Sequence, residues 1–287
     1  MPNTKRQTQS TERYRIRAVE RALILLKTFL GPKTDLGAAE ISKRVALDPS
    51  TTFRMLVTLE EHGFVKQDPA SGKYRLGASC LELGSQFLKS NDVRRSAFDV
   101  MLRLRERFGE TVHLGILDGH EIVYLEKVAG SHAIGLMSSR VGGRAPAHAT
   151  AIGKALLAFS VTENSDIAGA KWKLTHATPN TITSWKELTK TLGEIREEGY
   201  ALDNQEYELG VRCVAVPIFS HKGVTAALSI SGPIERMDEN IKKRGLVEEL
   251  KMAGSEVSAE MGWGRGVEHV GTAIDPRSMR TQGTRER

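Results

Sequence analysis

Two features in the C-terminal half of the sequence suit the binding of a small anion. The run His148-Ala149-Thr150-Ala151 is expected to open a helix, and the free backbone N–H groups at a helix N-terminus form a ready anion site. Ser229 and Ser231 alternate with Leu228 and Ile230, so both hydroxyls should face the same side of one strand. A serine pair and a helix N-terminus suit a small organic acid. The alternative is that the serines line a strand face turned towards solvent.

Catalytic chemistry is less well supported. Cys213 is a candidate nucleophile, with His113 or His148 as its base. Nothing in the sequence brings either histidine near Cys213, which sits in an apolar strand, so a small buried core residue is the favoured interpretation. Gly153-Lys154 invites comparison with a phosphate-binding loop, but G-x-x-x-x-G-K-[ST] fails at position 148, a histidine, and at position 155, an alanine. We therefore expect no catalytic residues; an enzyme that uses the pocket around Cys213 is the alternative.

The sequence predicts neither a metal nor a cofactor. The histidines lack metal-ligand spacing, and Cys80 and Cys213 are too far apart in the chain for a zinc ribbon or a disulfide framework. No apolar run approaches the roughly 18 residues of a membrane span, and the basic, polar N-terminus is not a secretory signal. We expect a protein of the reducing cytoplasm, with no membrane partner.

Positive charge is concentrated in the first third of the 287-residue chain. Residues 1–89 hold 15 Lys/Arg and 9 Asp/Glu, whereas the remainder holds 26 of each, so the net charge of +6 belongs to the first module. Such segregation is expected for a module with a polyanionic partner. On charge alone, nucleic-acid binding and a merely basic soluble domain are equal alternatives.

Three helices and a hairpin are expected in this module. The first helix ends at Gly31-Pro32 and has an apolar stripe at Ile16, Val19, Leu23, Leu26 and Leu30. A cap at Thr34 or Asp35 would begin a short second helix, with Leu36, Ile41 and Val45 on one face.

The third helix is expected to begin at Asp48-Pro49, an N-cap followed by proline at the first helical position. Its buried side is predicted to carry Phe53, Leu56 and Leu59. After His62-Gly63, residues 64–67 and 73–76 predict a hairpin with basic strands.

Helix, short helix, turn, helix and basic hairpin within about 60 residues match a winged helix-turn-helix, which places the start of its third helix in the major groove of DNA. The predicted DNA-binding residues are Lys43 and Arg44, then Ser50, Thr51, Thr52 and Arg54 on the third helix, and Lys73 and Arg75 on the wing. Arg54 has the bidentate fork that suits guanine, and the flanking cations suit phosphates. A trihelical protein-interaction module is the alternative.

The rest of the chain predicts an α+β fold. Helices are expected at 78–88, from Asn91-Asp92 to Gly109, and near 150–159, 184–198 and 238–261; strands are expected at 112–116, 122–125, 134–138, 200–203, 213–219 and 225–231. The predicted domains are a flexible basic arm at 1–15, the winged helix-turn-helix at 16–76, a linker helix at 77–91, a second domain at 92–262 and a disordered tail at 263–287.

Several blocks resemble the isocitrate lyase regulator (IclR) family of bacterial transcription factors. The matching blocks are RAVERAL at 17–23, TTFRMLVTLEEHGFV at 51–65, GRAPAHATAIGKA at 143–155, GVRCVAVP at 210–217 and SISGP at 229–233. Together they span roughly 16–262 in the family's order. One departure is Ala46, where the family usually has glycine in the turn of the helix-turn-helix.

The resemblance implies a GAF-like C-terminal domain whose antiparallel sheet holds a small effector. The effector-binding residues it implies are Ile134, Ala145, Ala151, Ile152, Asp203, Val211, Cys213, Ser229 and Ser231. Because Ala145 and Ala151 would leave room for a ring, an aromatic acid is one candidate.

We therefore expect a ligand-responsive, sequence-specific DNA-binding transcription regulator. Its expected partners are an operator DNA duplex, a small organic acid, a second copy in a homodimer that pairs further into a tetramer, and RNA polymerase if it acts as an activator. The helix at 78–88 carries more apolar residues than a free linker needs, so we expect it to pack against a partner. A structural DNA-binding protein whose second domain only dimerises is a further alternative.

Overall fold

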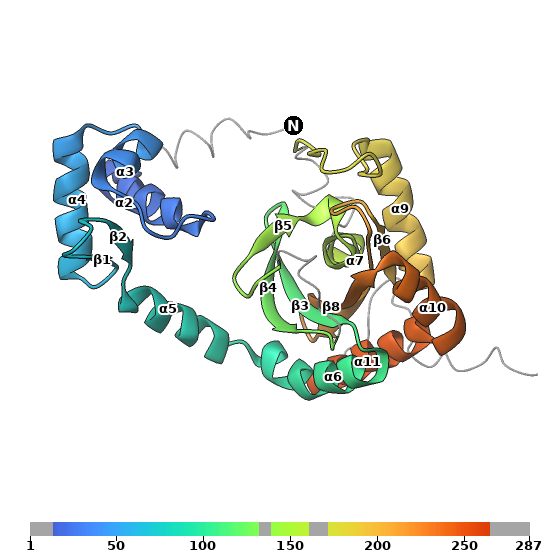
Figure 1. Ribbon diagram of the computed structural model, residues 1–287. Coiled ribbons are helices and arrows are strands. Elements are labelled where there is room, and N and C mark those ends of the chain that lie inside the picture. The colour runs from blue at the N-terminus through green and yellow to red at the C-terminus, as the bar shows by residue number, and fades with distance from the viewer. Residues whose placement is uncertain (1–13, 132–138, 161–171, 265–287) are drawn as a thin grey trace, which may run out of the picture. The chain divides into compact units, whose positions relative to one another are not determined.

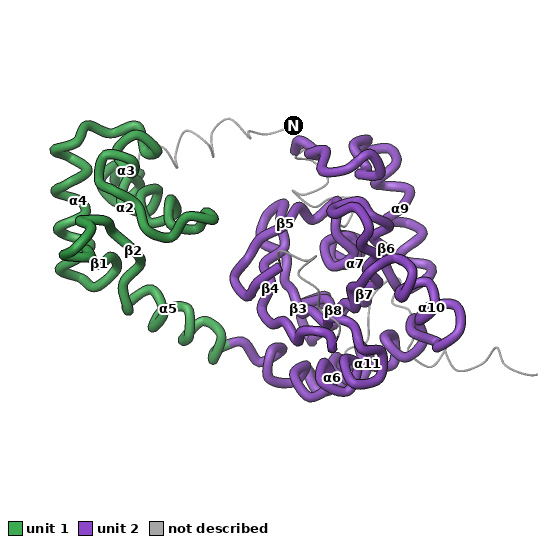
Figure 2. Tube along the Cα trace, in the orientation of Figure 1, with its two compact units in different colours: residues 1–90 green, residues 91–287 purple. Residues whose placement is uncertain are grey.

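The computed structural model describes residues 14–131, 139–160 and 172–264. The chain divides into two compact units, Met1–Ser90 and Asn91–Arg287 (Figure 2). The strand expected at 134–138, most of the arm and most of the tail lie outside the described residues.

The first unit has the predicted order of elements (Figure 1). It comprises α2 (Arg17–Lys27), η1 (Thr28–Leu30), α3 (Ala38–Val45), α4 (Pro49–Glu61), β1 (Val65–Gln67), β2 (Tyr74–Leu76) and α5 (Ala78–Lys89). Strands β1 and β2 form the expected antiparallel hairpin. Its core consists of Leu25, Phe29, Leu36, Ile41, Leu56, Val65 and Tyr74. A helix-turn-helix and a wing therefore share one small core.

The predicted start of the second helix was wrong. Helix α3 begins at Ala38 after Gly37, and neither Thr34 nor Asp35 caps it. Leu36 instead pairs with Tyr74 of the wing, and each backbone N–H donates to the other's carbonyl oxygen at 3.0 and 2.8 Å. The segment before α3 is extended because it adds a bridge to the hairpin.

Most of the predicted apolar stripe of α2 faces outward in the single chain. Leu25 and Phe29 are buried, whereas Ile16, Val19, Leu23 and Leu30 are all more than half exposed. The segment is apolar on two sides, and the side that carries Leu25 meets the core. Of the predicted stripe, Leu26 packs against the core, whereas the other four residues lie at the surface.

Helix α4 begins as predicted, and Leu56 and Leu59 face the core as predicted, but Phe53 does not. The Asp48 carboxylate accepts the Thr51 N–H at 2.8 Å, which is the expected N-cap. Thr52 and Leu56 are buried, while Phe53 is 56% exposed. The prediction that Phe53 lies on the core side was therefore wrong.

Ala46 adopts the left-handed conformation that the turn requires, with φ 52° and ψ 44°. This conformation costs an L-residue about 1–2 kcal/mol, and glycine avoids most of that cost. The turn keeps its geometry here without the glycine that is usual in the family.

The second unit is built on a six-stranded antiparallel sheet of order β5-β4-β3-β8-β7-β6. The strands are β3 (Thr111–Asp118), β4 (Glu121–Val128), β5 (Arg144–Pro146), β6 (Ala201–Asn204), β7 (Val211–Ser220) and β8 (Gly223–Pro233). The strands expected at 112–116, 122–125, 200–203, 213–219 and 225–231 are confirmed.

Helices cover both faces of this sheet (Figure 1). On one face, η2 (Ala147–Ala149) leads into α7 (Ala151–Ser160), which packs on β3, β7 and β8, and α9 (Trp185–Glu198) packs on α7. On the other face lie α6 (Asp92–Phe108) and α11 (Leu246–Glu260), with α10 (Ile234–Arg244) beside β8. The single helix expected at 238–261 is two helices, because Gly245 takes a left-handed φ of 67° between them.

Candidate functional site

A pocket opens between the sheet and the start of α7. Its volume is about 230 Å³, below the roughly 300–1,000 Å³ of sites for drug-sized ligands. It is lined by His113, Tyr124, Ser139, Arg140, Gly143, Arg144, Thr150, Ala151, Ile152, Asp203, Tyr207, Glu208, Val211, Cys213, Ser229 and Ser231. A site of this size suits a small molecule with several polar groups.

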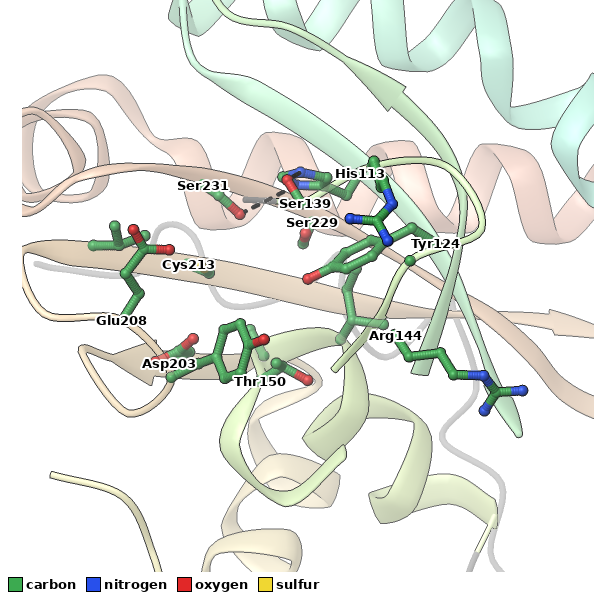
Figure 3. Close-up of a pocket in the computed structure, with 16 residues that line it drawn as sticks. His113, Tyr124, Ser139, Arg144, Thr150, Asp203, Glu208, Cys213, Ser229 and Ser231 are labelled. Carbon is green, nitrogen blue, oxygen red and sulfur yellow. Dashed lines mark hydrogen bonds between the residues drawn. The ribbon is translucent and has the colours of Figure 1, made fainter. Parts of the chain in front are cut away.

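One side of the pocket is a linked set of imidazole and hydroxyl groups (Figure 3). His113 Nε2 lies 2.8 Å from Ser139 Oγ, and its Nδ1 lies 3.4 Å from Ser231 Oγ. The Tyr124 ring lies beside it, with 5.1 Å between ring centroids. Burial, and secondarily Lys127, lowers the pKa of His113 to about 3. The imidazole is therefore neutral at physiological pH and has one donor and one acceptor nitrogen.

Thiol and acidic groups continue the lining from Ser231, since Cys213 on β7 is paired with Ser231 on β8. Asp203 on β6 is paired with Cys213 on β7, and the Asp203 carboxyl accepts the Glu206 N–H at 2.7 Å. Burial raises the pKa of Asp203 to about 7, although the Glu206 N–H bond acts in the opposite direction. Burial and then the Asp203 carboxyl raise the pKa of Cys213 well above its ordinary value. Cys213 is therefore a neutral thiol, which is a poor nucleophile.

The start of α7 forms the floor. Ala151 and Ile152 are the first two residues of the helix, and amides at these positions have no acceptor within a helix. Thr150 precedes them and lies on the Asp203 side of the pocket (Figure 3). Its hydroxyl accepts the Gly153 N–H at 3.1 Å and donates to the Pro146 carbonyl at 3.2 Å. This arrangement suits an anion, which the positive end of the helix dipole would attract.

A buried ion pair anchors the turn between β6 and β7, which carries Tyr207 and Glu208 on the pocket wall. Lys154 of α7 pairs with Glu206, and both side chains are buried. Lys154 Nζ also donates to the Leu202 carbonyl at 2.5 Å. The Thr181 hydroxyl donates to the Glu206 carbonyl at 2.6 Å. The pocket wall is thus tied to the helix that forms the floor.

Most of the predicted effector-binding residues come together here. Those that line the pocket are Ala151, Ile152, Asp203, Val211, Cys213, Ser229 and Ser231. The serine pair is buried and faces the cavity, so the alternative of a solvent-facing strand is wrong. Ala145 does not line it; β5 is an edge strand, and Ala145 packs in the hydrophobic core beside Ile122. Ile134 lies outside the described residues.

Several lining residues were not among the predicted effector-binding residues. His113 was considered only as a base for Cys213, and strand pairing brings both residues into this pocket. His113 alternates with Val112 and Leu114, and register places it opposite Ser229. The alternation of residues 112–114 puts His113 on one face of its strand. Only the pairing of β3 with β8 shows that this is the face that carries the serines. Tyr207 and Glu208 follow β6 in a turn, and no periodic pattern marks them.

The predicted DNA-binding residues all belong to the first unit. Lys43, Arg54, Lys73 and Arg75 are exposed, as a phosphate or base contact requires. Arg44 is exposed as well, but it pairs with Glu40 at 2.8 Å and donates to the Thr28 carbonyl at 3.3 Å.

Two hydroxyl residues of α4 serve the helix itself. The Ser50 hydroxyl donates to the Asp48 carboxylate at 2.8 Å. Thr52 is fully buried, and its hydroxyl donates to the Asp48 carbonyl at 3.0 Å. The assignment of Thr52 to the DNA-facing side was therefore wrong. Thr51 is half-buried, and its N–H bonds to the cap.

Two properties of the described residues bear on other functions. Within 14–131, 139–160 and 172–264, no group of three or more histidine, cysteine or acidic residues is placed to hold a metal ion. In the same ranges no helix has the length and apolar character needed to cross a membrane.

Both parts of the chain match families of known proteins. The IclR helix-turn-helix domain matches residues 18–69, and the bacterial transcriptional regulator IclR C-terminal domain matches residues 85–259. The chain is 43% identical over 249 residues to the HTH-type transcriptional regulator XynR of Escherichia coli, which covers 86% of this chain and 98% of that protein. It is 34% identical over 252 residues to the transcriptional repressor IclR of the same organism, over 86% and 90% of the two chains.

Solved structures of IclR-family proteins resemble this chain as well. The Thermotoga maritima IclR structure aligns with a TM-score of 0.67 at 35% identity, over 87% of this chain and all of that one (100%). An IclR homolog from Microbacterium hydrocarbonoxydans complexed with 4-hydroxybenzoate aligns with a TM-score of 0.73 at 28% identity, over 85% and 99% of the two chains.

Proposed function

Because this chain belongs to the IclR family of bacterial transcription regulators and is not an enzyme, we propose that a small organic acid in the pocket of the second unit controls how the first unit binds operator DNA. The observation that carries this proposal is the pocket itself, where the start of α7 meets a neutral histidine and a serine pair.

The chemistry of the lining supports an acid as the effector. The amides of the first turn of α7 and the hydroxyls of Ser229 and Ser231 suit a carboxylate. A protonated Asp203 would add a donor beside Thr150, at the start of α7 (Figure 3). The 4-hydroxybenzoate bound to the homolog is an aromatic acid. We therefore propose both aromatic and aliphatic acids as effector classes. Ala145 does not line the pocket, so it is not an argument for an aromatic ring.

The exposed cations of the helix-turn-helix support operator recognition. We assign base contact to Arg54 and phosphate contact to Lys43, Lys73 and Arg75. Operator DNA lies in the cytoplasm, and we place the protein there. An activator of this design would in addition contact RNA polymerase, whereas a repressor would release or hold DNA as the acid binds.

Exposed apolar faces support assembly with a second copy. On α2 the residues Ile16, Val19 and Leu23 are exposed. Helix α5 buries no residue in the single chain, and Leu81 and Phe87 on it are 73% and 51% exposed. Faces of this kind mark protein interfaces, so we propose that α2 and α5 pair with their copies in a homodimer and that homodimers associate into a tetramer.

The test is a titration of the full-length protein against DNA from upstream of its own gene. It would be done at two salt concentrations with a panel of aliphatic and aromatic acids that includes 4-hydroxybenzoate. We expect sequence-specific binding that one acid changes severalfold. Arg54→Ala should weaken specific binding and leave the acid affinity unchanged. Binding that is blind to sequence and to every acid would contradict the proposal.

A further inference from the structure

The surface of α4 that faces solvent is partly apolar. Among its exposed residues are Phe53 and Val57, which are 56% and 36% exposed, beside Ser50 and Arg54; Pro49, Thr58 and Glu61 are exposed as well. Neither apolar residue belongs to the cluster formed by the core of the first unit and the side chains packed against it. A half-exposed phenylalanine keeps apolar surface in water that contact with another group would remove. The core of the first unit therefore does not account for the exposed part of Phe53.

The position of Phe53 limits what can cover it. It lies near the start of the second helix of a helix-turn-helix, next to Arg54, and the N-terminal residues of that helix contact base edges. The surface of α4 around Phe53 carries the cation of Arg54 and the hydroxyl of Ser50. The exposed carboxylate of α4, Glu61, lies at the other end of the helix. In the major groove, the C5-methyl of thymine is the apolar group that a side chain such as phenylalanine contacts.

We propose that Phe53 reads a thymine methyl group in each operator half-site, beside the base contacted by Arg54. Val57, one helical turn further on, flanks the same methyl. The proposal rests on operator binding by the first unit, and it adds an apolar determinant that the predicted polar contacts lack. Thr52 and Leu56 form the buried side of α4, which leaves Phe53 on the side that faces solvent. This phase brings an aromatic ring, rather than a second hydroxyl, to the DNA.

The experiment replaces single thymines of the operator by uracil, which removes only the methyl group. The full-length protein would be titrated with the operator found upstream of its gene and with each uracil-substituted duplex. For the wild type we expect one thymine per half-site at which uracil lowers the affinity about fourfold, the value of one buried methyl. In Phe53→Ala the ratio of the affinity for the thymine duplex to that for the uracil duplex should fall to one. Phe53→Leu should retain part of it.

Phe98→Ala is the matched control, because Phe98 is an exposed phenylalanine of α6 in the second unit. It should keep the wild-type thymine-to-uracil ratio. A Phe53→Ala protein that keeps this ratio at every thymine overturns the proposal, as does a wild type indifferent to all uracil substitutions. If Phe53→Ala instead changes the oligomeric state by sedimentation while the ratio persists, Phe53 covers a protein interface. If no specific operator binding is found at all, the proposed function fails rather than the role of Phe53.

Discussion

Asp203 is buried and lines the pocket. Its protonation state therefore changes near neutral pH and can affect ligand binding. Its pKa of about 7 lies well above the ordinary value of 3.8 because the carboxyl is buried. The folded chain therefore holds this proton more tightly than the unfolded chain does. The stability that the protonated form contributes is present below about pH 4 and is lost as the pH rises to about 7.

We predict that binding of an anionic acid weakens as the pH rises above 7, by up to about tenfold per pH unit, because the ionised Asp203 would repel the ligand. Asp203→Asn keeps the acceptor for the Glu206 N–H and should remove this dependence. Isothermal titration between pH 6 and 9 measures both proteins. Asp99→Asn, an exposed site on α6, should retain the wild-type slope. An equal slope in Asp203→Asn would assign the dependence to another group.

The buried ion pair of Lys154 and Glu206 is a second property of single residues that affects the pocket. Both side chains are buried, and one Glu206 carboxylate oxygen has no hydrogen-bond partner. Removal of Lys154 would leave a buried charge unpaired, which typically costs about 3–5 kcal/mol.

We predict that Lys154→Met lowers the free energy of unfolding by about 3–5 kcal/mol in urea titrations, and that Lys154→Met with Glu206→Met recovers at least half of the loss. Lys190→Met removes an exposed lysine that pairs with Glu194 on α9 and should change stability by less than about 1 kcal/mol. A Lys154→Met protein as stable as the wild type would show that the pair does not anchor the pocket wall.

At the scale of elements, the positions of the helices and strands were easier to predict from the sequence than the side of each helix that is buried. Capping by Asp48 and the alternation of residues 228–231 have local causes, and both were predictable. The phase of α4 depends on contact with other elements, so Thr52 and Phe53 were exchanged. The segment at α2 has two apolar sides, and periodicity alone does not say which one meets the core.

In the pocket, too, the features that lie within one element were predictable, and those that depend on contact between elements were not. Its serine pair and the start of α7 were recognisable because each lies within one element. His113 enters only through the register of β3 with β8, and Ala145 drops out because its edge strand turns it to the core. Residues brought together by pairing of distant strands leave no pattern in the local sequence.

Helix α5 allows a prediction about assembly. Glu82, Gln86 and Lys89 share one face, at spacings of four and three residues, while Leu81, Leu83, Phe87 and Leu88 occupy the opposite side. Because the apolar side is exposed in the single chain, a charge there should harm the assembly and spare the fold.

We predict that Phe87→Glu shifts the protein from dimer to monomer in analytical ultracentrifugation and lowers operator affinity about tenfold or more, because two half-sites are no longer read together. Its thermal unfolding should change little. Gln86→Glu adds the same charge to the polar face and should leave both properties unchanged. A Phe87→Glu protein that remains dimeric would move the interface to other surfaces.

At the scale of the whole molecule, the pocket and the DNA-facing helix belong to different compact units. An effector changes DNA affinity only if it binds two states of the protein with different affinity, and the coupling is typically about 1–3 kcal/mol, or about 5–150-fold. Linkage makes this coupling reciprocal, so that operator DNA must change the affinity for the acid by the same factor.

We predict that the acid found in the panel binds the operator complex more weakly or more tightly than the free protein, by the factor by which the acid changes operator affinity. Titration calorimetry of the acid into free protein, into the operator complex and into a complex with unrelated DNA measures this factor directly. Unrelated DNA should give a smaller change, because phosphate contacts alone do not require both recognition helices to be in register. Phe87→Glu should reduce the factor towards one while the acid still binds, since a monomer has no second DNA-binding unit to reposition. Equal acid affinities in all three wild-type titrations would mean that the pocket is not coupled to DNA binding.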